Sequence, residues 1–139
     1  MSLVEIIESG NTRLAEWILE EYTTDSEYNV DVNCHDVDRE TALMIACSRG
    51  DLEIVKLLLS RSDLEINLQD MYGRTALMGS CWRGHLEIVE LLLSKSDINI
   101  NIRNKQGWKA LTIAEFEMFL PKSHKRYNTI CHLLGKNQN

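Results

Sequence analysis

Apolar residues recur along the chain in two alternating patterns, both with the spacing of an α-helix. Leu43, Ala46 and Cys47 follow i, i+3, i+4 spacing and therefore share one face of a helix. Gly50 interrupts this pattern, and a second apolar stripe follows, made of Ile54, Val55, Leu58 and Leu59. The pattern predicts two short helices in succession, separated by a break at the glycine.

The link that follows these helices, at 60–70, carries a different pattern. Leu64, Ile66 and Leu68 alternate with polar residues, which predicts an extended backbone. The next four residues, Asp-Met-Tyr-Gly at 70–73, predict a tight turn, because glycine takes a positive φ at no steric cost. One unit is therefore a helix, a turn, a second helix and an extended, hairpin-like loop.

This unit recurs at an interval of 34 residues, and two copies match most closely. A third copy begins at Ala110 and Leu111, and a degenerate first copy has Gly10 in the place of Gly50. The repeated segments are TALM at 41–44 and 75–78, LEIV at 52–55 and 86–89, and LLLS at 57–60 and 91–94.

Periods of about 20–50 residues are typical of stacked units, whose terminal copies differ because one of their faces meets water. The sequence therefore predicts an all-α solenoid of paired antiparallel helices with hairpin-like loops. We expect a single domain at 1–139, with units at approximately 1–35, 36–69, 70–103 and 104–136.

The last unit contains an insertion of eight residues before its second apolar stripe. Pro121 lies within it, and proline inside a helix removes a hydrogen bond and clashes one turn back. We therefore expect Phe119 and Leu120 to end a lengthened first helix and Pro121–Lys125, with His124, to form a loop.

The third unit resembles the ankyrin repeat. A 34-residue period also occurs in tetratricopeptide repeats, but their aromatic pair and terminal proline are absent here. In the second unit Arg39 stands at the place of the turn glycine, which puts the usual positive φ of that turn in doubt. The residues that carry the resemblance are Asp70, Gly73, Thr75 and Leu77, followed by Gly84, His85, Leu86, Glu87, Ile88 and Val89.

Composition and charge narrow the functional classes. The chain has 139 residues and a net charge of −6, and a net acidic chain is a poor general binder of polyanions. No apolar run approaches the roughly 18–20 residues that a membrane span needs. The acidic N-terminal segment does not resemble a secretory signal. We expect a cytoplasmic protein, with the nucleus as the alternative, and no membrane partner.

The residues that could support catalysis or metal binding are poorly arranged for either. Cys47 and Cys81 are one period apart, so they occupy the same buried place in neighbouring units, too far apart for a disulfide. Cys131 and His132 are adjacent, and adjacent helical residues do not face each other. Cys34 has no CxxC partner. We expect no enzyme, no catalytic residue, no metal and no cofactor.

The resemblance to ankyrin repeats implies a concave groove formed by the turn tips and the outer faces of the first helices. Several of these positions change between units where the scaffold repeats; Ser48, for example, becomes Trp82. Aromatic residues and arginine are typical of binding hot spots. The predicted partner-binding residues are Asp38, Glu40, Arg49, Met71, Tyr72, Arg74, Trp82, Arg83, Arg103, Lys105, Trp108 and Phe116.

These residues predict a basic, aromatic groove on an acidic protein. We expect a monomer that binds another protein through an acidic surface or peptide, as an adaptor or as a stoichiometric inhibitor. The alternative is an RNA strand in the same groove, held by stacking and arginine contacts, which the acidic chain disfavours. The resemblance further implies that Asn67, preceded by Leu59 and Glu65, is a candidate for asparagine hydroxylation.

Overall fold

The computed structural model describes residues 1–22, 30–119 and 124–137. Within these residues the chain is all-α, and it forms no β-strand. This confirms the predicted fold class. The helices are α1 (Leu3–Glu8), α2 (Thr12–Glu21), α3 (Ala42–Arg49), α4 (Leu52–Leu59), α5 (Ala76–Arg83), α6 (Leu86–Leu93), α7 (Ala110–Met118) and α8 (His124–Lys136).

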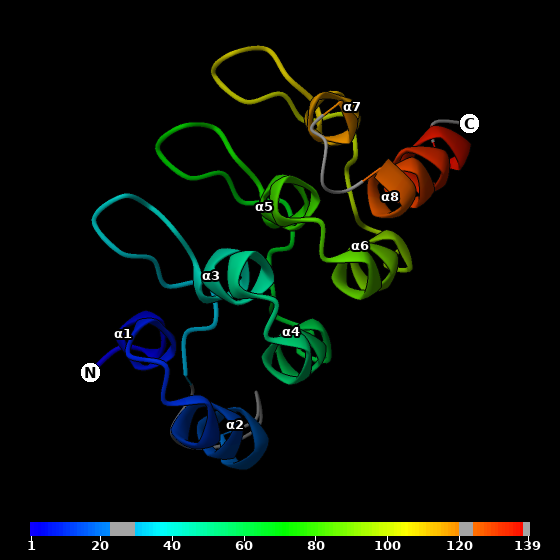
Figure 1. Cartoon of the computed structure of the whole chain (residues 1–139). Helices are drawn as coiled ribbons and strands as arrows, with labels where there is room; N and C mark the ends of the chain where they lie inside the picture. The colour runs from blue at the N-terminus through cyan, green and yellow to red at the C-terminus, as the bar shows by residue number, and fades with distance from the viewer. Residues whose placement is uncertain (23–29, 120–123, 138–139) are drawn as a thin grey trace.

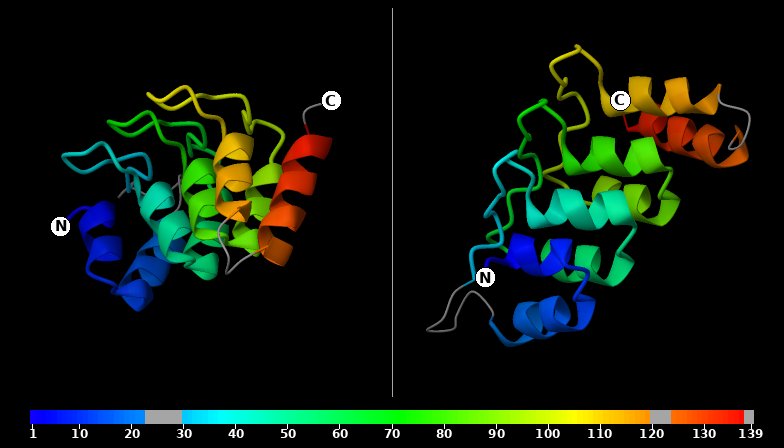
Figure 2. Two further views of the ribbon diagram at one scale, coloured as in Figure 1. Left: turned by 45° about the horizontal axis from the view of Figure 1, so that its top comes forward. Right: turned by 60° about the vertical axis from the view of Figure 1, so that its left-hand side comes forward.

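The helices stack in two layers (Figure 1). The odd-numbered helices pack on one another in the order α1, α3, α5, α7, and the even-numbered helices α2, α4, α6 and α8 form the second layer. The links between helix pairs project together from the side of the odd-numbered layer (Figure 2). Each new pair therefore adds one helix to each layer and one loop to a row of loops.

The core lies between the two layers. On α4 the stripe of Ile54, Val55 and Leu58 is buried, and Ile88, Val89 and Leu92 repeat it on α6. Cys47 and Cys81 are fully buried on α3 and α5, and burial raises the pKa of both thiols. The cysteines therefore pack as small apolar residues, as their spacing predicts, and all four are free thiols.

Local signals define the ends of the odd-numbered helices. Thr41 and Thr75 are the N-caps of α3 and α5, and each side chain accepts a hydrogen bond from the backbone amide three residues on. Gly50 and Gly84 end these helices in the left-handed conformation, with φ of 82° and 71°. The TALM segment and the glycine of each copy thus fix the same eight-residue helix twice.

A side chain from the next helix pair binds the C-terminal end of α1, of α3 and of α5. The carbonyl that accepts the bond belongs to the residue two positions before a glycine in the left-handed conformation. In the first helix pair that glycine is Gly10, so the carbonyl is that of Glu8. Here the guanidinium of Arg49, on α3, donates to the carbonyl of Glu8 at 2.6 Å and to that of Ile7. Arg49 thereby ties α1 to α3.

The two following junctions use different chemistry for the same bond. Nε2 of His85 donates to the carbonyl of Ser48 over 3.1 Å, and the hydroxyl of Tyr127 donates to that of Trp82 over 2.9 Å. The rings of these two side chains lie against the left-handed glycines of α3 and α5. Arg49, His85 and Tyr127 thus make equivalent hydrogen bonds between successive helix pairs, although their side chains differ.

The links differ from the predicted extended backbone, because residues 60–70 form turns and irregular structure. At the tip, one side-chain oxygen of Asp70 accepts hydrogen bonds from the amides of Tyr72 and Arg74, both at 2.8 Å. Asp36 and Asn104 make the equivalent pair of bonds one period earlier and later. Side-chain hydrogen bonds of this kind satisfy backbone groups that a strand would have paired.

Successive turn tips are also bonded to one another. The amide of Met71 donates to the carbonyl of Asp38 at 2.9 Å, and that of Lys105 donates to Tyr72 at 3.0 Å. Arg39 has a φ of 64°, so the second unit keeps its left-handed turn residue without a glycine. The tips therefore form a continuous row with fixed spacing.

The C-terminal insertion differs in part from the prediction. Helix α7 ends at Met118 with Phe119 as its C-cap, close to the expected end. The predicted loop was wrong for His124 and Lys125, which begin α8. Leu120 and Pro121 lie outside the residues that the structure describes.

Candidate functional site

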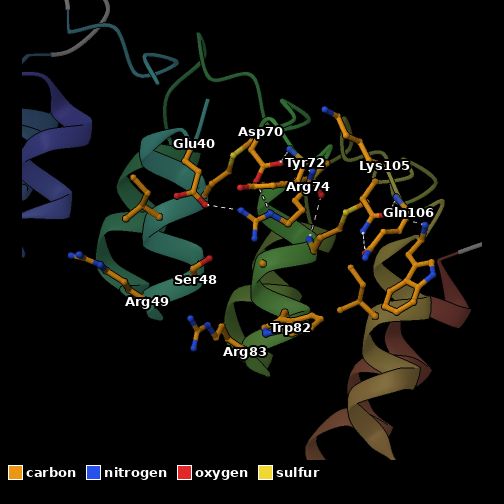
Figure 3. Close-up of a pocket in the computed structure, with 18 of the residues that line it drawn as sticks. Glu40, Ser48, Arg49, Asp70, Tyr72, Arg74, Trp82, Arg83, Lys105 and Gln106 are labelled. Carbon is orange, nitrogen blue, oxygen red and sulfur yellow. Dashed lines mark hydrogen bonds and ion pairs between the residues drawn. The ribbon is translucent and has the colours of Figure 1, made fainter. Parts of the chain in front are cut away.

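A groove of about 650 Å³ runs along the odd-numbered helices and beneath the turn tips (Figure 3). Its walls come from α3, α5 and α7, and its rim comes from the turns that precede α5 and α7. It is lined by Glu8, Glu40, Met44, Ile45, Ser48, Arg49, Asp70, Tyr72, Arg74, Thr75, Met78, Gly79, Trp82, Arg83, Asn104, Lys105, Gln106, Trp108 and Ile113.

The groove brings together most of the predicted partner-binding residues, namely Glu40, Arg49, Tyr72, Arg74, Trp82, Arg83, Lys105 and Trp108. Four predicted residues do not line it. Asp38 and Met71 belong to the turn tips, where their backbones bond to each other. Arg103 donates to the carbonyl of Gly107 at 2.7 Å within its own turn, and Phe116 packs against Trp108 with the ring centroids 5.7 Å apart.

Two aromatic side chains of the groove are exposed to solvent. Trp82 on α5 is 49% exposed, and Tyr72 at the turn tip is 53% exposed. The hydroxyl of Tyr127 holds the backbone of Trp82, while the indole itself lines the groove. Trp108 is half-buried against Phe116. Trp82 and Tyr72 therefore offer large apolar surfaces that the scaffold does not cover.

Arg74 is held by the protein itself. Its Nε donates to Asp70 at 2.6 Å, and another nitrogen of the guanidinium pairs with Glu40 at 3.2 Å. The guanidinium also lies over the ring of Tyr72, 4.8 Å from the centroid. Burial raises the pKa of Glu40, although the charge of Arg74 acts in the opposite direction. Arg74 therefore fixes the turn tip and has its charge compensated.

The groove is consequently less basic than the sequence suggests. Four basic and three acidic side chains line it, and Arg49 and Arg74 are both engaged within the protein. Arg83 and Lys105 are exposed, and their side chains make no hydrogen bond or ion pair with the residues that the structure describes. These two cations are therefore the ones available to a ligand.

A family model of ankyrin repeats matches residues 3–104 of the chain in three copies. The chain is an ankyrin-repeat protein. No curated protein was found to match it. Ankyrin repeats generally mediate protein–protein interaction, and the family is typically a non-catalytic interaction module.

Sequence reasoning missed several residues of this ankyrin groove. Met44 and Met78 are identical residues one period apart, so the sequence suggested a purely structural role for them. Both nevertheless line the groove. Gly79 did carry a signal, because Ile45 and Ile113 stand at the equivalent places one period before and after. Asp70 was recognised as part of the turn and of the ankyrin pattern but not as a groove residue, and Asn104 was not singled out.

Asn67 lies in the link between ankyrin units, where both ends of its amide are bonded. Its nitrogen donates to the carbonyl of Asp97, and its oxygen accepts from the amide of Asn99, each at 2.8 Å. Asn33 makes the same two bonds one unit earlier, to Asp63 and Glu65. The side chain therefore ties successive links together, and its hydroxylation stays a prediction.

The cysteine and histidine residues of the last pair are not arranged as a catalytic site. His132 is exposed on α8, and burial raises the pKa of Cys131, which disfavours a thiolate. Among the described residues, no group of three or more His, Cys, Asp or Glu side chains could hold a metal ion. The same residues include no helix long and apolar enough to cross a bilayer.

Proposed function

We propose that the groove binds a partner protein and that the chain acts without catalysis, as an adaptor or as a stoichiometric inhibitor. The observation that carries this proposal is Trp82, an indole that is 49% exposed in a groove, at a place where the preceding unit has only Ser48. Exposed tryptophan and tyrosine beside arginine are the residue types of binding hot spots. The partner surface is acidic, because Arg83 and Lys105 are the uncompensated charges.

We also propose that residues 1–139 form one domain of four ankyrin units, with α7 and α8 as the fourth. The matched copies end at residue 104. The turn at Asn104 nevertheless repeats the hydrogen bonds of the turns at Asp36 and Asp70. Tyr127 also repeats the junction bond made by His85. Both features support a further unit beyond the matched copies.

Affinity capture with a matched control tests the binding proposal. Trp82→Ala is compared with Trp17→Ala, because Trp17 is 50% exposed on α2 and does not line the groove. We expect Trp82→Ala to lose captured proteins by weakening binding by about 2 kcal/mol or more, with Trp17→Ala unaffected. Equal capture by the wild-type protein and Trp82→Ala would contradict the proposal.

The same experiment separates a protein partner from RNA. Capture from nuclease-treated extract should be unchanged if the partner is a protein. Binding that disappears with nuclease, and an affinity that falls steeply with the logarithm of the salt concentration, would instead indicate RNA.

A further inference from the structure

The groove contains a glycine in the middle of a helix, at a place where the neighbouring units carry larger residues. Gly79 lies in the middle of α5, where Ile45 and Ile113 occupy the equivalent positions. Its backbone is not in the left-handed region, so an L-residue fits its conformation. Glycine inside a helix is less favourable than alanine. The helix is therefore less stable than it could be, at a residue that lines the groove.

The missing side chain leaves a notch in the floor of the groove, with the hydroxyl of Ser48 at its edge. Apart from its chain neighbours and the nearby backbone of its own helix, a Cβ atom added at Gly79 would meet only this hydroxyl, at 2.9 Å, so the hydroxyl would have to turn away. Gly79 and Trp82 are three residues apart on α5, so they lie on the same helix face. The notch is thus bordered by Ser48 on α3 and by the exposed indole, a setting suited to one small apolar side chain of a ligand.

The two available cations lie at opposite ends of this face. Arg83 is the last residue of α5, and the backbone of Lys105 is bonded to Tyr72 in the turn before the helix. Figure 3 shows Trp82 and Arg83 at the lower end of α5, Tyr72 at its upper end, and Lys105 beyond Tyr72, in the turn that leads into α7. An eight-residue helix is about 12 Å long, and the turn adds several ångströms.

We propose that the occupant of the groove is an extended peptide segment with two acidic residues bracketing a small apolar side chain. The acids pair with Arg83 and Lys105, and the apolar side chain enters the notch at Gly79. An extended chain rises about 3.3 Å per residue, so the two acids are separated by roughly four to six positions. This inference rests on the proposed function, because it assumes that the groove is the binding site.

Synthetic peptides test the spacing. The probes are fluorescein-labelled peptides with a central valine and with two aspartates separated by two, five or eight intervening residues. Fluorescence anisotropy measures their affinity for the full chain. We expect the peptide with five intervening residues to bind at least ten-fold more tightly than the other two, and to lose most of this advantage when glycine replaces the valine.

Variants of the protein test the notch and the cations. Arg83→Gln and Lys105→Gln should each weaken binding of the peptide with five intervening residues at least five-fold. Gly79→Ala should weaken it to a similar extent while raising or preserving the thermal midpoint, because Ser48 can turn its hydroxyl away. The control is Gly135→Ala on α8, where replacing glycine by alanine likewise favours the helix and an added Cβ meets no atom of another element within 4 Å, and which should leave peptide binding unchanged.

The inference is wrong if the three peptides bind with equal affinity or if none of them binds. It is also wrong if Gly79→Ala binds the peptide as tightly as the wild-type protein does. Either result leaves the proposed function standing if capture of the natural partner is still lost in Trp82→Ala. If that capture is insensitive to Trp82, the proposed function fails by itself.

Discussion

The arginines of this protein are divided between holding the fold and facing the groove. Arg49 reaches the last carbonyls of α1, and Arg61 reaches the carbonyls of Tyr22 and Val30 while pairing with Asp63. A cation at the C-terminal end of a helix also interacts favourably with the helix dipole. Sequence spacing could not reveal these roles, because the partners lie about one unit away and are backbone atoms. The exposed Trp82 was predictable, since it breaks the period.

Replacing Arg49 by alanine tests its structural role. The substitution leaves the carbonyls of Ile7 and Glu8 without this donor, so we expect a loss of about 1–2 kcal/mol in unfolding free energy. Hydrogen exchange should locate the loss in α1 and α2. Arg83→Ala serves as the control and should leave stability unchanged. If Arg49→Ala unfolds at the same urea concentration as the wild-type protein, Arg49 does not stabilise the fold and its role is in the groove.

The pair Arg61–Asp63 should make stability depend on acid. The hydrogen bond from Arg61 lowers the pKa of Asp63 below its ordinary value of 3.8, so the folded state holds fewer protons than the unfolded state. The contribution is therefore complete above pH 4 and is lost as the pH falls through the lowered pKa. Asp63→Asn should lower the thermal midpoint at pH 7 and flatten its decline below pH 4. Parallel midpoint curves for the two proteins would exclude this pair as the source.

At the scale of the helices, the sequence predicted where the helices lie better than it predicted the backbone conformation of the links between them. Helices α3 to α6 lie where the periodic apolar residues and the glycine breaks place them. The links were expected to be extended because Leu64, Ile66 and Leu68 alternate with polar residues. Asp70 and its counterparts bond the backbone locally, however, and local bonding competes with strand formation. The alternating apolar residues therefore indicated which side chains pack against the core. They did not indicate whether the backbone forms strand hydrogen bonds.

Two leucines of the even-numbered helices should each contribute strongly to packing. Leu58 and Leu92 are completely buried at equivalent places on α4 and α6. Replacing either by alanine should lower the unfolding free energy by about 2–5 kcal/mol, because both transfer and cavity terms are lost. Leu57→Ala is the matched control, because Leu57 is only partly buried and its truncation should therefore cost less. Urea denaturation measures all three, and equal effects would show that the helix register is wrong.

At the scale of the whole molecule, the last helix pair is built differently from the middle of the stack. Cys47 and Cys81 are buried, whereas the residue one period further, Glu115, is exposed on α7. In α7 a solvent-facing carboxylate thus takes the place that a buried cysteine holds in the two preceding units. The groove then lies along the row of odd-numbered helices and not at an end. Its position follows from the repeat, whereas its chemistry depends on the few positions that break the repeat.

Tyr127 tests whether α7 and α8 belong to the same cooperative unit as the matched repeats. Solenoid units contact only their neighbours, so cooperativity depends on the junctions between them. Tyr127→Phe keeps the ring against Gly84 but removes the bond to the carbonyl of Trp82, at an expected cost of about 1 kcal/mol.

In a single domain, this variant should lower the midpoint of one urea transition, seen alike by circular dichroism and by tryptophan fluorescence. It should also speed hydrogen exchange at the C-terminal end of α5, because the released carbonyl belongs to the residue that carries the exposed indole. Weaker partner binding would follow, since Trp82 and Arg83 are no longer held in place. Two separate transitions in the wild-type protein would instead make the last helix pair an independent appendage, and its junction bond could not position the groove.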